Sequence, residues 1–108
     1  MTLYIDTTRR AARVELRRGE KIVDHRTWGN TPSVGGELIE HISNLLSERN
    51  LTLRDVKKVV VNPGPGHFSA VRTGIVTATL LSFATGAELY AEGNDSPVDI
   101  VEPVYSDR

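Results

Sequence analysis

The stretch Val59–Gly74, VVVNPGPGHFSAVRTG, is the segment that decides the fold. Its three valines form an apolar run typical of a buried strand, and two glycines and two prolines then make a stiff turn. A long segment with an apolar face follows, so the stretch predicts a strand, a glycine-rich turn and a helix. Ser69 is the expected N-cap of this helix. Backbone N–H groups at the helix start would suit a phosphate or a carboxylate, and a tight turn without a ligand explains the same residues.

The segments around this stretch predict one α/β domain. Strands are expected at Thr2–Ile5, Ala11–Arg17, Lys21–Trp28, Lys58–Asn62 and Glu88–Ala91, and helices at Ser33–Arg49 and Ser69–Thr85. Thr52–Asp55 has the pattern of a capping box that opens one short turn. The order β-β-β-α-β-α-β, with right-handed crossovers, predicts a mixed five-stranded sheet of order 3-2-1-4-5. This is the ribonuclease-H-like layout of the actin-like (ASKHA) proteins, and by itself it limits function only weakly.

Composition excludes several classes of protein. The 108 residues carry a formal net charge of −1 and no cysteine, which excludes disulfide scaffolds, thiol catalysis and thiolate metal sites. The N-terminus lacks the basic and apolar regions of a signal peptide. The longest uncharged stretch, Thr73–Ala87, is short and rich in threonine, so no membrane span is expected. The sequence therefore predicts a cytoplasmic protein with no membrane partner.

Two groups of residues suggest an anion or metal site. Asp6 and Thr7 follow the first strand, where a carboxylate could hold a metal, but a two-metal nuclease needs several converging carboxylates. The first helix could supply Glu37 or Glu40, whereas Asn62 stands where a further carboxylate is expected. The alternative is that Asp6 and Thr7 satisfy backbone groups of a turn.

Gly64 and Gly66 have the spacing of a phosphate loop, yet no Gly-Lys-Ser/Thr follows them. A tight strand-to-helix turn and a phosphate loop thus both stay open for these residues, and the family resemblance described below implies a vestigial phosphate loop, with no catalytic residue, cofactor or metal.

The second long helix is apolar on more than one face, which predicts that a helix of another chain packs against it. Gly35 and Gly36 near the start of the first helix have two interpretations: a frayed first turn, or a close approach of another helix. The residues expected to contact a partner are Gly35, Gly36, Ile39, Ser43, Arg72, Ile75, Thr79 and Phe83.

Three segments resemble the N-terminal domain of the TsaB family, also called YeaZ: Tyr4–Leu16, Leu45–Leu53 and Val59–Gly74. The loop residues Gly64-Pro65-Gly66, Phe68, Val71-Arg72 and Gly74 are in register with the family's GRGPGSFTGVRIG-type loop. Val101–Tyr105 resembles an EPVYLR-type segment near the family's C-terminus. The resemblance implies an actin-like domain at residues 1–92. It also implies a linker at 93–97 in place of a second domain, and a tail at 98–108 that packs on the domain or its partner.

The resemblance also implies a function and partners. TsaB is catalytically inert and supports TsaD, which transfers a threonylcarbamoyl group to tRNA adenosine, and the ATPase TsaE joins them. We therefore expect a TsaD-like partner, a TsaE-like ATPase, a homodimer in isolation and only indirect contact with tRNA. Pro63, His67 and Ala70 depart from the family's Arg, Ser and Gly, and Val34 from its His, which argues against a retained anion site. The alternatives are a ribonuclease-H-like metal-dependent nuclease and a self-associating protein that has lost the tRNA role.

Overall fold

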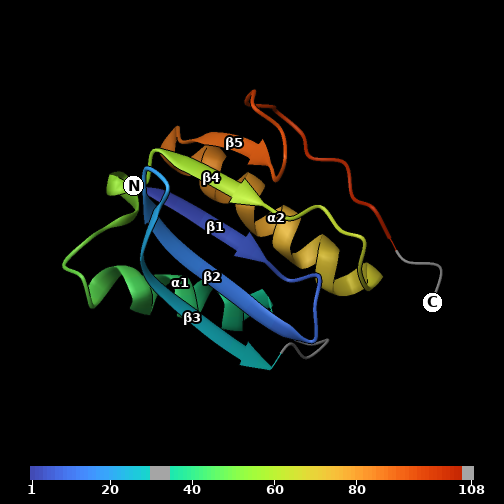
Figure 1. Ribbon diagram of the computed structural model, residues 1–108, viewed down its shortest axis with the longest axis horizontal. Helices are drawn as coiled ribbons and strands as arrows, with labels where there is room; N and C mark the ends of the chain where they lie inside the picture. Colours follow the sequence, from blue (N-terminus) through green and yellow to red (C-terminus); the bar gives the residue numbers. More distant parts are fainter. Residues whose placement is uncertain (30–34, 106–108) are drawn as a thin grey trace.

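The computed structural model describes residues 1–29 and 35–105. Its sheet has the order β3-β2-β1-β4-β5, as predicted. β1 runs antiparallel to β2 and parallel to β4, and β5 runs parallel to β4. Figure 1 shows both long helices on the same face of the sheet. The elements are β1 (Thr2–Asp6), β2 (Ala11–Arg18), β3 (Lys21–Gly29), α1 (Gly35–Ser47), the short 3₁₀ turn η1 (Leu53–Asp55), β4 (Lys58–Val61), α2 (Phe68–Thr85) and β5 (Glu88–Ala91).

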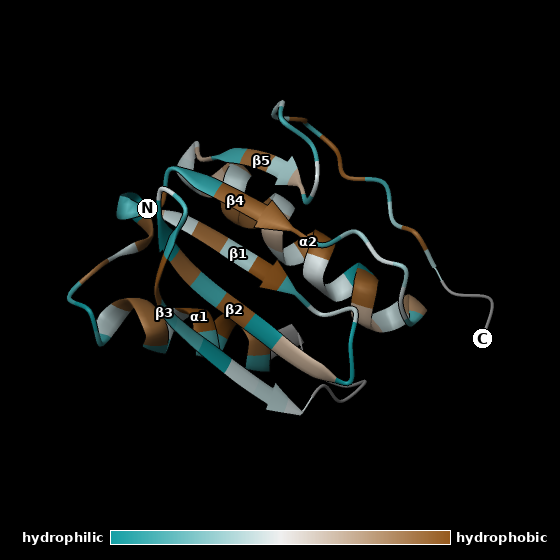
Figure 2. Cartoon of the chain, viewed as in Figure 1, coloured by the Kyte–Doolittle hydropathy of each residue, from teal (hydrophilic) through white to brown (hydrophobic). Residues whose placement is uncertain are grey.

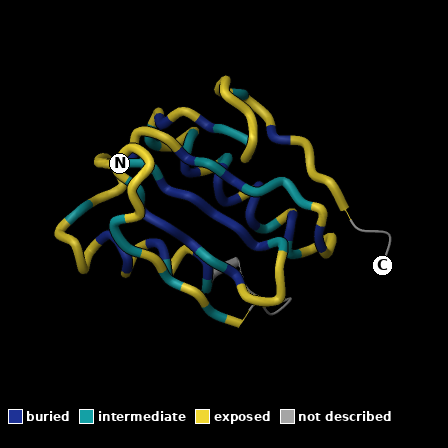
Figure 3. The backbone as a smooth tube through the Cα atoms, in the orientation of Figure 1, coloured by how far each residue is buried: buried dark blue, intermediate teal, exposed yellow. Residues whose placement is uncertain are grey.

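The core lies between the sheet and the two helices. Every second residue of β1, β2 and β4 points toward the helices, because successive side chains of a strand alternate between its two faces. The strand residues of the core are Leu3, Ile5, Val14, Leu16, Val59, Val61 and Leu89, and α1 adds Leu38, Ile42, Leu45 and Leu46. Figure 2 shows brown alternating with teal along β2 and a largely brown β4, and Figure 3 shows the middle of the sheet as buried. The predicted strands are therefore confirmed, each to within one residue at its ends.

The start of α2 differs from the prediction. The helix begins at Phe68, and His67 occupies the N-cap position without a side-chain capping bond. The carbonyl of His67 already accepts the first helical hydrogen bond, from the Val71 N–H at 2.9 Å. Ser69 therefore lies inside the first turn, and its prediction as the N-cap was wrong. Gly86 ends the helix as expected, with a φ of 76°. The expected start of the first helix, Ser33 and Val34, lies outside the described residues.

α2 is more hydrophobic than a helix with one buried face requires. Its 18 residues have a mean hydropathy of 1.2, which suffices by length and composition alone to cross a membrane. The expectation that no segment spans a membrane stays a prediction, because core helices of soluble proteins can reach the same hydropathy. One face of α2 packs on the sheet and α1 through Val71, Ile75, Ala78 and Leu81. The high hydropathy arises because the outward face is apolar as well.

The segment Val98–Tyr105, called the C-terminal tail below, folds back over the domain. Figure 1 shows it running from β5 toward the N-terminal end of α2. Val98 donates its N–H to the Leu89 carbonyl of β5 at 2.8 Å, and Val101 is buried, with 3% exposed. Ile100 is 75% exposed and Val104 is half-exposed. Val101 is thus the apolar side chain of the C-terminal tail that is fully buried.

Candidate partner-binding surface

The residues proposed for a metal site form a closed hydrogen-bonded turn. One Asp6 carboxylate oxygen accepts the Thr8 N–H at 2.9 Å and the Thr8 hydroxyl at 2.7 Å. The other oxygen accepts the Asn62 side-chain amide at 3.3 Å and lies 3.8 Å from Arg9. Within residues 1–29 and 35–105, no group of three His, Cys, Asp or Glu side chains is placed to hold a metal ion. This geometry supports the interpretation of Asp6 as a residue that ties two loops together.

Thr7 and Gly74 connect the end of β1 to α2. The Thr7 hydroxyl donates to the Ala70 carbonyl at 2.6 Å, and Thr7 is almost fully buried. A Cβ at Gly74 would lie well under 3.0 Å from the Thr7 hydroxyl oxygen. Gly74 therefore allows α2 to approach the end of β1 closely enough for this hydrogen bond to form.

The two glycines of the loop Asn62–His67, the glycine loop below, also mark close approaches. A Cβ at Gly66 would lie 2.8 Å from the Thr8 carbonyl oxygen. Gly64 has a φ of 115°, and a Cβ there would overlap the Val104 carbonyl oxygen of the C-terminal tail. Packing of chain segments thus explains both glycines without a bound phosphate.

A stripe of exposed residues runs along the outward face of α2. We call Phe68, Arg72, Val76, Leu80 and Phe83 the α2 stripe; their spacing of three or four residues places them on one side of the helix. Leu80 is 61% and Phe83 88% exposed, and Phe68 and Val76 are about half-exposed. Arg72 is the one charged residue of α2, and its guanidinium lies 5.9 Å from the centre of the Phe68 ring. The stripe is a largely apolar helix surface that the described chain leaves open, apart from the contact of Phe68 with Tyr105.

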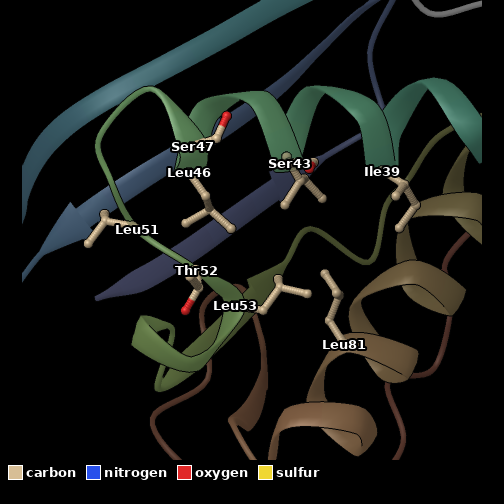
Figure 4. A pocket seen from close by; sticks show the side chains of 9 residues that line it. Ile39, Ser43, Leu46, Ser47, Leu51, Thr52, Leu53 and Leu81 are labelled. Atoms are coloured by element: carbon tan, nitrogen blue, oxygen red, sulfur yellow. The ribbon is translucent and has the colours of Figure 1, made fainter.

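A cavity of about 340 Å³ between α1, η1 and α2 lies beside the core. Figure 4 shows apolar side chains from all three elements converging on it. Ile39 on α1 and Leu53 on η1 are both exposed at its rim. The capping box that was predicted for η1 is present, with the Asp55 carboxylate accepting the Thr52 N–H at 2.8 Å. The lining residues are Ile39, Ile42, Ser43, Leu46, Ser47, Leu51, Thr52, Leu53 and Leu81.

The structure brings half of the predicted contact residues to these two surfaces. Ile39 and Ser43 line the cavity, and Arg72 and Phe83 belong to the α2 stripe. Ile75 does not fit the prediction, because it faces the sheet and is buried in the core.

The remaining predicted residues are less informative. Thr79 is partly buried, and its hydroxyl donates to the Ile75 carbonyl at 2.7 Å. Gly35 and Gly36 begin α1, and their burial lies outside what the structure describes. The interpretation of these two glycines stays open. Sequence reasoning missed Phe68, Val76 and Leu80 as surface residues, although their four-residue spacing with Arg72 was a signal for a shared face.

The opposite face of the sheet has a different character. The buried Glu15 carboxylate accepts hydrogen bonds from Arg13 at 2.5 Å and from Arg17 at 2.7 Å. Burial would raise the pKa of Glu15, but these two hydrogen bonds lower it overall. Burial and a hydrogen bond to Glu92 raise the pKa of Tyr4 well above its usual value. This face presents a paired polar network, so the apolar surface that could receive a partner lies on the helical side.

Comparison with known proteins places the chain in a family. A sequence profile of TsaD, tRNA N6-adenosine threonylcarbamoyltransferase, matches residues 36–92, just over half of the chain. No curated protein matches the chain by sequence. Among solved structures, YeaZ from Pseudomonas aeruginosa is similar, with 26% identity, a TM-score of 0.75, and coverage of 83% of this chain and 42% of that one.

A second crystal structure is nearly as similar. It is described as an uncharacterized protein with similarity to peptidase YEAZ from Pseudomonas aeruginosa. It shares 26% identity with a TM-score of 0.72, and the match covers 83% of this chain and 41% of that one. The chain thus spans less than half the length of either structure. The chain belongs to the TsaD family, and it is a YeaZ-like (TsaB-like) protein with a mixed five-stranded, actin-like fold.

Proposed function

We propose that this protein is a non-catalytic partner subunit that supports a TsaD-type enzyme in threonylcarbamoyl transfer to tRNA adenosine. The observation that carries the proposal is the unpartnered apolar surface on α1, η1 and α2, in a chain that is YeaZ-like. The hydrogen-bonded Asp6 turn supports the non-catalytic part, since both carboxylate oxygens already have partners in the fold.

The apolar residues of the α2 stripe supply only part of the free energy that association requires. Fully burying one large apolar side chain contributes about 1.5–3 kcal/mol. The four apolar residues of the α2 stripe are already partly covered, so they would contribute several kcal/mol together. Association costs about 4–15 kcal/mol in lost translational and rotational freedom. A stable complex therefore requires that the cavity beside Ile39 and Leu53 is filled as well, and we propose that the partner contacts both surfaces.

The proposed occupant is a helical surface of a TsaD-like subunit, with a carboxylate opposite Arg72. A second copy of this chain would compete for the same surface, so a homodimer is expected in isolation. A TsaE-like ATPase would join the heterodimer, and tRNA would be contacted through the complex.

Co-purification with the TsaD-type enzyme of the same organism tests the proposal. We expect a stable complex of the two chains, and we expect Phe83→Asp to weaken it at least tenfold because a charge would be buried among apolar side chains. Ile22→Asp is the matched control, because Ile22 is an exposed apolar residue on β3 that belongs neither to the α2 stripe nor to the lining of the cavity.

Two results would overturn the proposal: no complex at micromolar concentration, or equal binding by wild type and Phe83→Asp. Light scattering of the isolated chain tests the homodimer separately. A species of only 11.9 kDa would contradict self-association without bearing on the heterodimer. A homodimer without any complex with the enzyme would instead favour a self-associating protein that has lost the tRNA role.

A further inference from the structure

The glycine loop holds a strand of the chain itself. We propose that this loop is a receptor for an extended peptide strand, and that its ligand is the C-terminal tail Val98–Tyr105. The tail would act as a strap that keeps the loop and the first turn of α2 in place. This inference is independent of any partner protein.

Backbone groups make the first set of contacts between loop and tail. Val104 donates its N–H to the Pro63 carbonyl at 2.7 Å, and Tyr105 forms a parallel bridge with Gly66. The Val104 carbonyl oxygen occupies the space where any side chain at position 64 would begin. A chain segment that approaches this closely requires glycine at the contact. The strand itself therefore explains why position 64 is a glycine.

Side chains anchor the tail on both sides of this contact. Val101 is inserted into the core, and the Tyr105 ring lies 4.7 Å from the Phe68 ring, measured between centroids. At the other end, the Val98 N–H bonds to Leu89 on β5, which is the edge strand of the sheet. Main-chain hydrogen bonds combined with pockets for single side chains are the means by which proteins bind extended peptides at sheet edges.

The strap has consequences for the residues around it. It covers part of the β5 edge, where unpaired backbone groups would otherwise invite another strand. It also supports the start of α2, where the N-cap His67 makes no side-chain capping bond. Because Tyr105 contacts Phe68, the strap borders one end of the α2 stripe. A ligand that needed the surface beside Gly64 would have to displace the tail.

Amide hydrogen exchange of Gly64→Ala tests the backbone contact. We expect the Val104 amide to exchange at least tenfold faster than in wild type, relative to the core amide of Val59, because the new Cβ displaces the tail. Gly86→Ala is the matched control. Gly86 also has a positive φ, of 76°, but no atom lies within 4 Å of a Cβ there, so strain is introduced without a clash. The proposal is overturned if Val104 stays protected in Gly64→Ala, or if both variants lose its protection equally.

A second pair of variants tests the side-chain anchor. Val101→Ala should speed exchange at the amides of Val104 and Val98 together, because both ends of the strap depend on the buried side chain. Ile100→Ala removes a neighbouring apolar side chain that is mostly exposed, and it should leave these amides unchanged. Equal exchange in the two variants would overturn the proposal.

Thiol cross-linking tests whether the tail is bound by its own chain. The protein has no cysteine, so Phe68→Cys combined with Tyr105→Cys introduces the only two thiols. A short cross-linker should join them within one chain. Phe68→Cys with Phe83→Cys is the control, because fifteen residues of helix separate these positions by about 22 Å. Cross-links only between chains, or none, in the first variant would contradict the proposal.

Discussion

Replacing Gly74 with alanine tests how α2 is held against the end of β1. On an isolated helix this change would stabilise the helix by about 1 kcal/mol, because glycine has the higher backbone entropy. In this protein we expect the opposite sign. The new methyl group would overlap the Thr7 hydroxyl, which is buried and donates to the Ala70 carbonyl at 2.6 Å.

The expected magnitude follows from three contributions. The helix gains about 1 kcal/mol from alanine. Inserting a methyl group into a packed contact costs about 1–3 kcal/mol. Displacing the Thr7 hydroxyl breaks a buried hydrogen bond, and leaving that hydroxyl unsatisfied costs about 1–3 kcal/mol. We therefore expect Gly74→Ala to lower the free energy of unfolding by about 1–5 kcal/mol.

Equilibrium unfolding in urea measures this change. A loss of 2 kcal/mol would lower the denaturation midpoint by about 1 M, since m-values of small proteins are about 1–3 kcal/mol/M. The double variant with Thr7→Ala is the decisive comparison, because it removes the oxygen that the methyl group overlaps. Thr7→Ala should therefore destabilise the Gly74→Ala protein less than it destabilises wild type. A Gly74→Ala protein more stable than wild type, or additive effects of the two changes, would refute the proposed contact.

Three further predictions concern the core, the polar face and the glycine loop. Leu45→Ala should lower the free energy of unfolding by about 2–5 kcal/mol, because the side chain is fully buried. Ile39→Ala at the surface should change the free energy of unfolding by about 0.5 kcal/mol or less. Thermal melts of both variants measure the difference. Glu15→Gln should destabilise the protein at pH 7 by about 1–3 kcal/mol. Folding lowers the pKa of Glu15, so the ionised Glu15 carboxylate stabilises the protein fully at pH values above its pKa in the unfolded chain. This stabilisation is lost as the pH falls through the pKa of Glu15 in the folded protein. Urea unfolding at several pH values below 4.5 should therefore show wild type and Glu15→Gln converging. ATP should not bind tightly, since the Val104 backbone lies against Gly64 and the loop has no lysine; a micromolar or tighter dissociation constant by calorimetry would contradict this.

The order and pairing of the elements could be predicted because their signals are local. Residues 11–17 alternate between apolar and charged, and Gly86 follows an apolar helix that it ends with a positive φ. Such patterns depend on neighbours within a few positions of the chain, and the connection rules for parallel strands then allow few topologies. The start of α2 was misplaced by one residue, because serine at position 69 is a good N-cap by type while the backbone of His67 takes that role.

The candidate surface could be predicted only in part. The composition of α2 indicates a second apolar face. It does not indicate how that face is oriented relative to the sheet. Ile75 and Val76 are adjacent β-branched residues with the same propensities, yet one is in the core and the other is half-exposed. A rotation of about 100° per residue separates their directions, so the register of packing decides between them.

The strand order, the two helices and the family resemblance of the loop follow from the amino-acid sequence, because spacing and residue type suffice for these. The roles of the loop residues follow only from the packed structure. Asp6, Gly64, Gly66 and Gly74 are each explained by a contact with a segment distant in the chain: Asn62, Val104, Thr8 and Thr7, respectively. No local pattern encodes such a contact, since it exists only once the sheet, α2 and the tail have packed together.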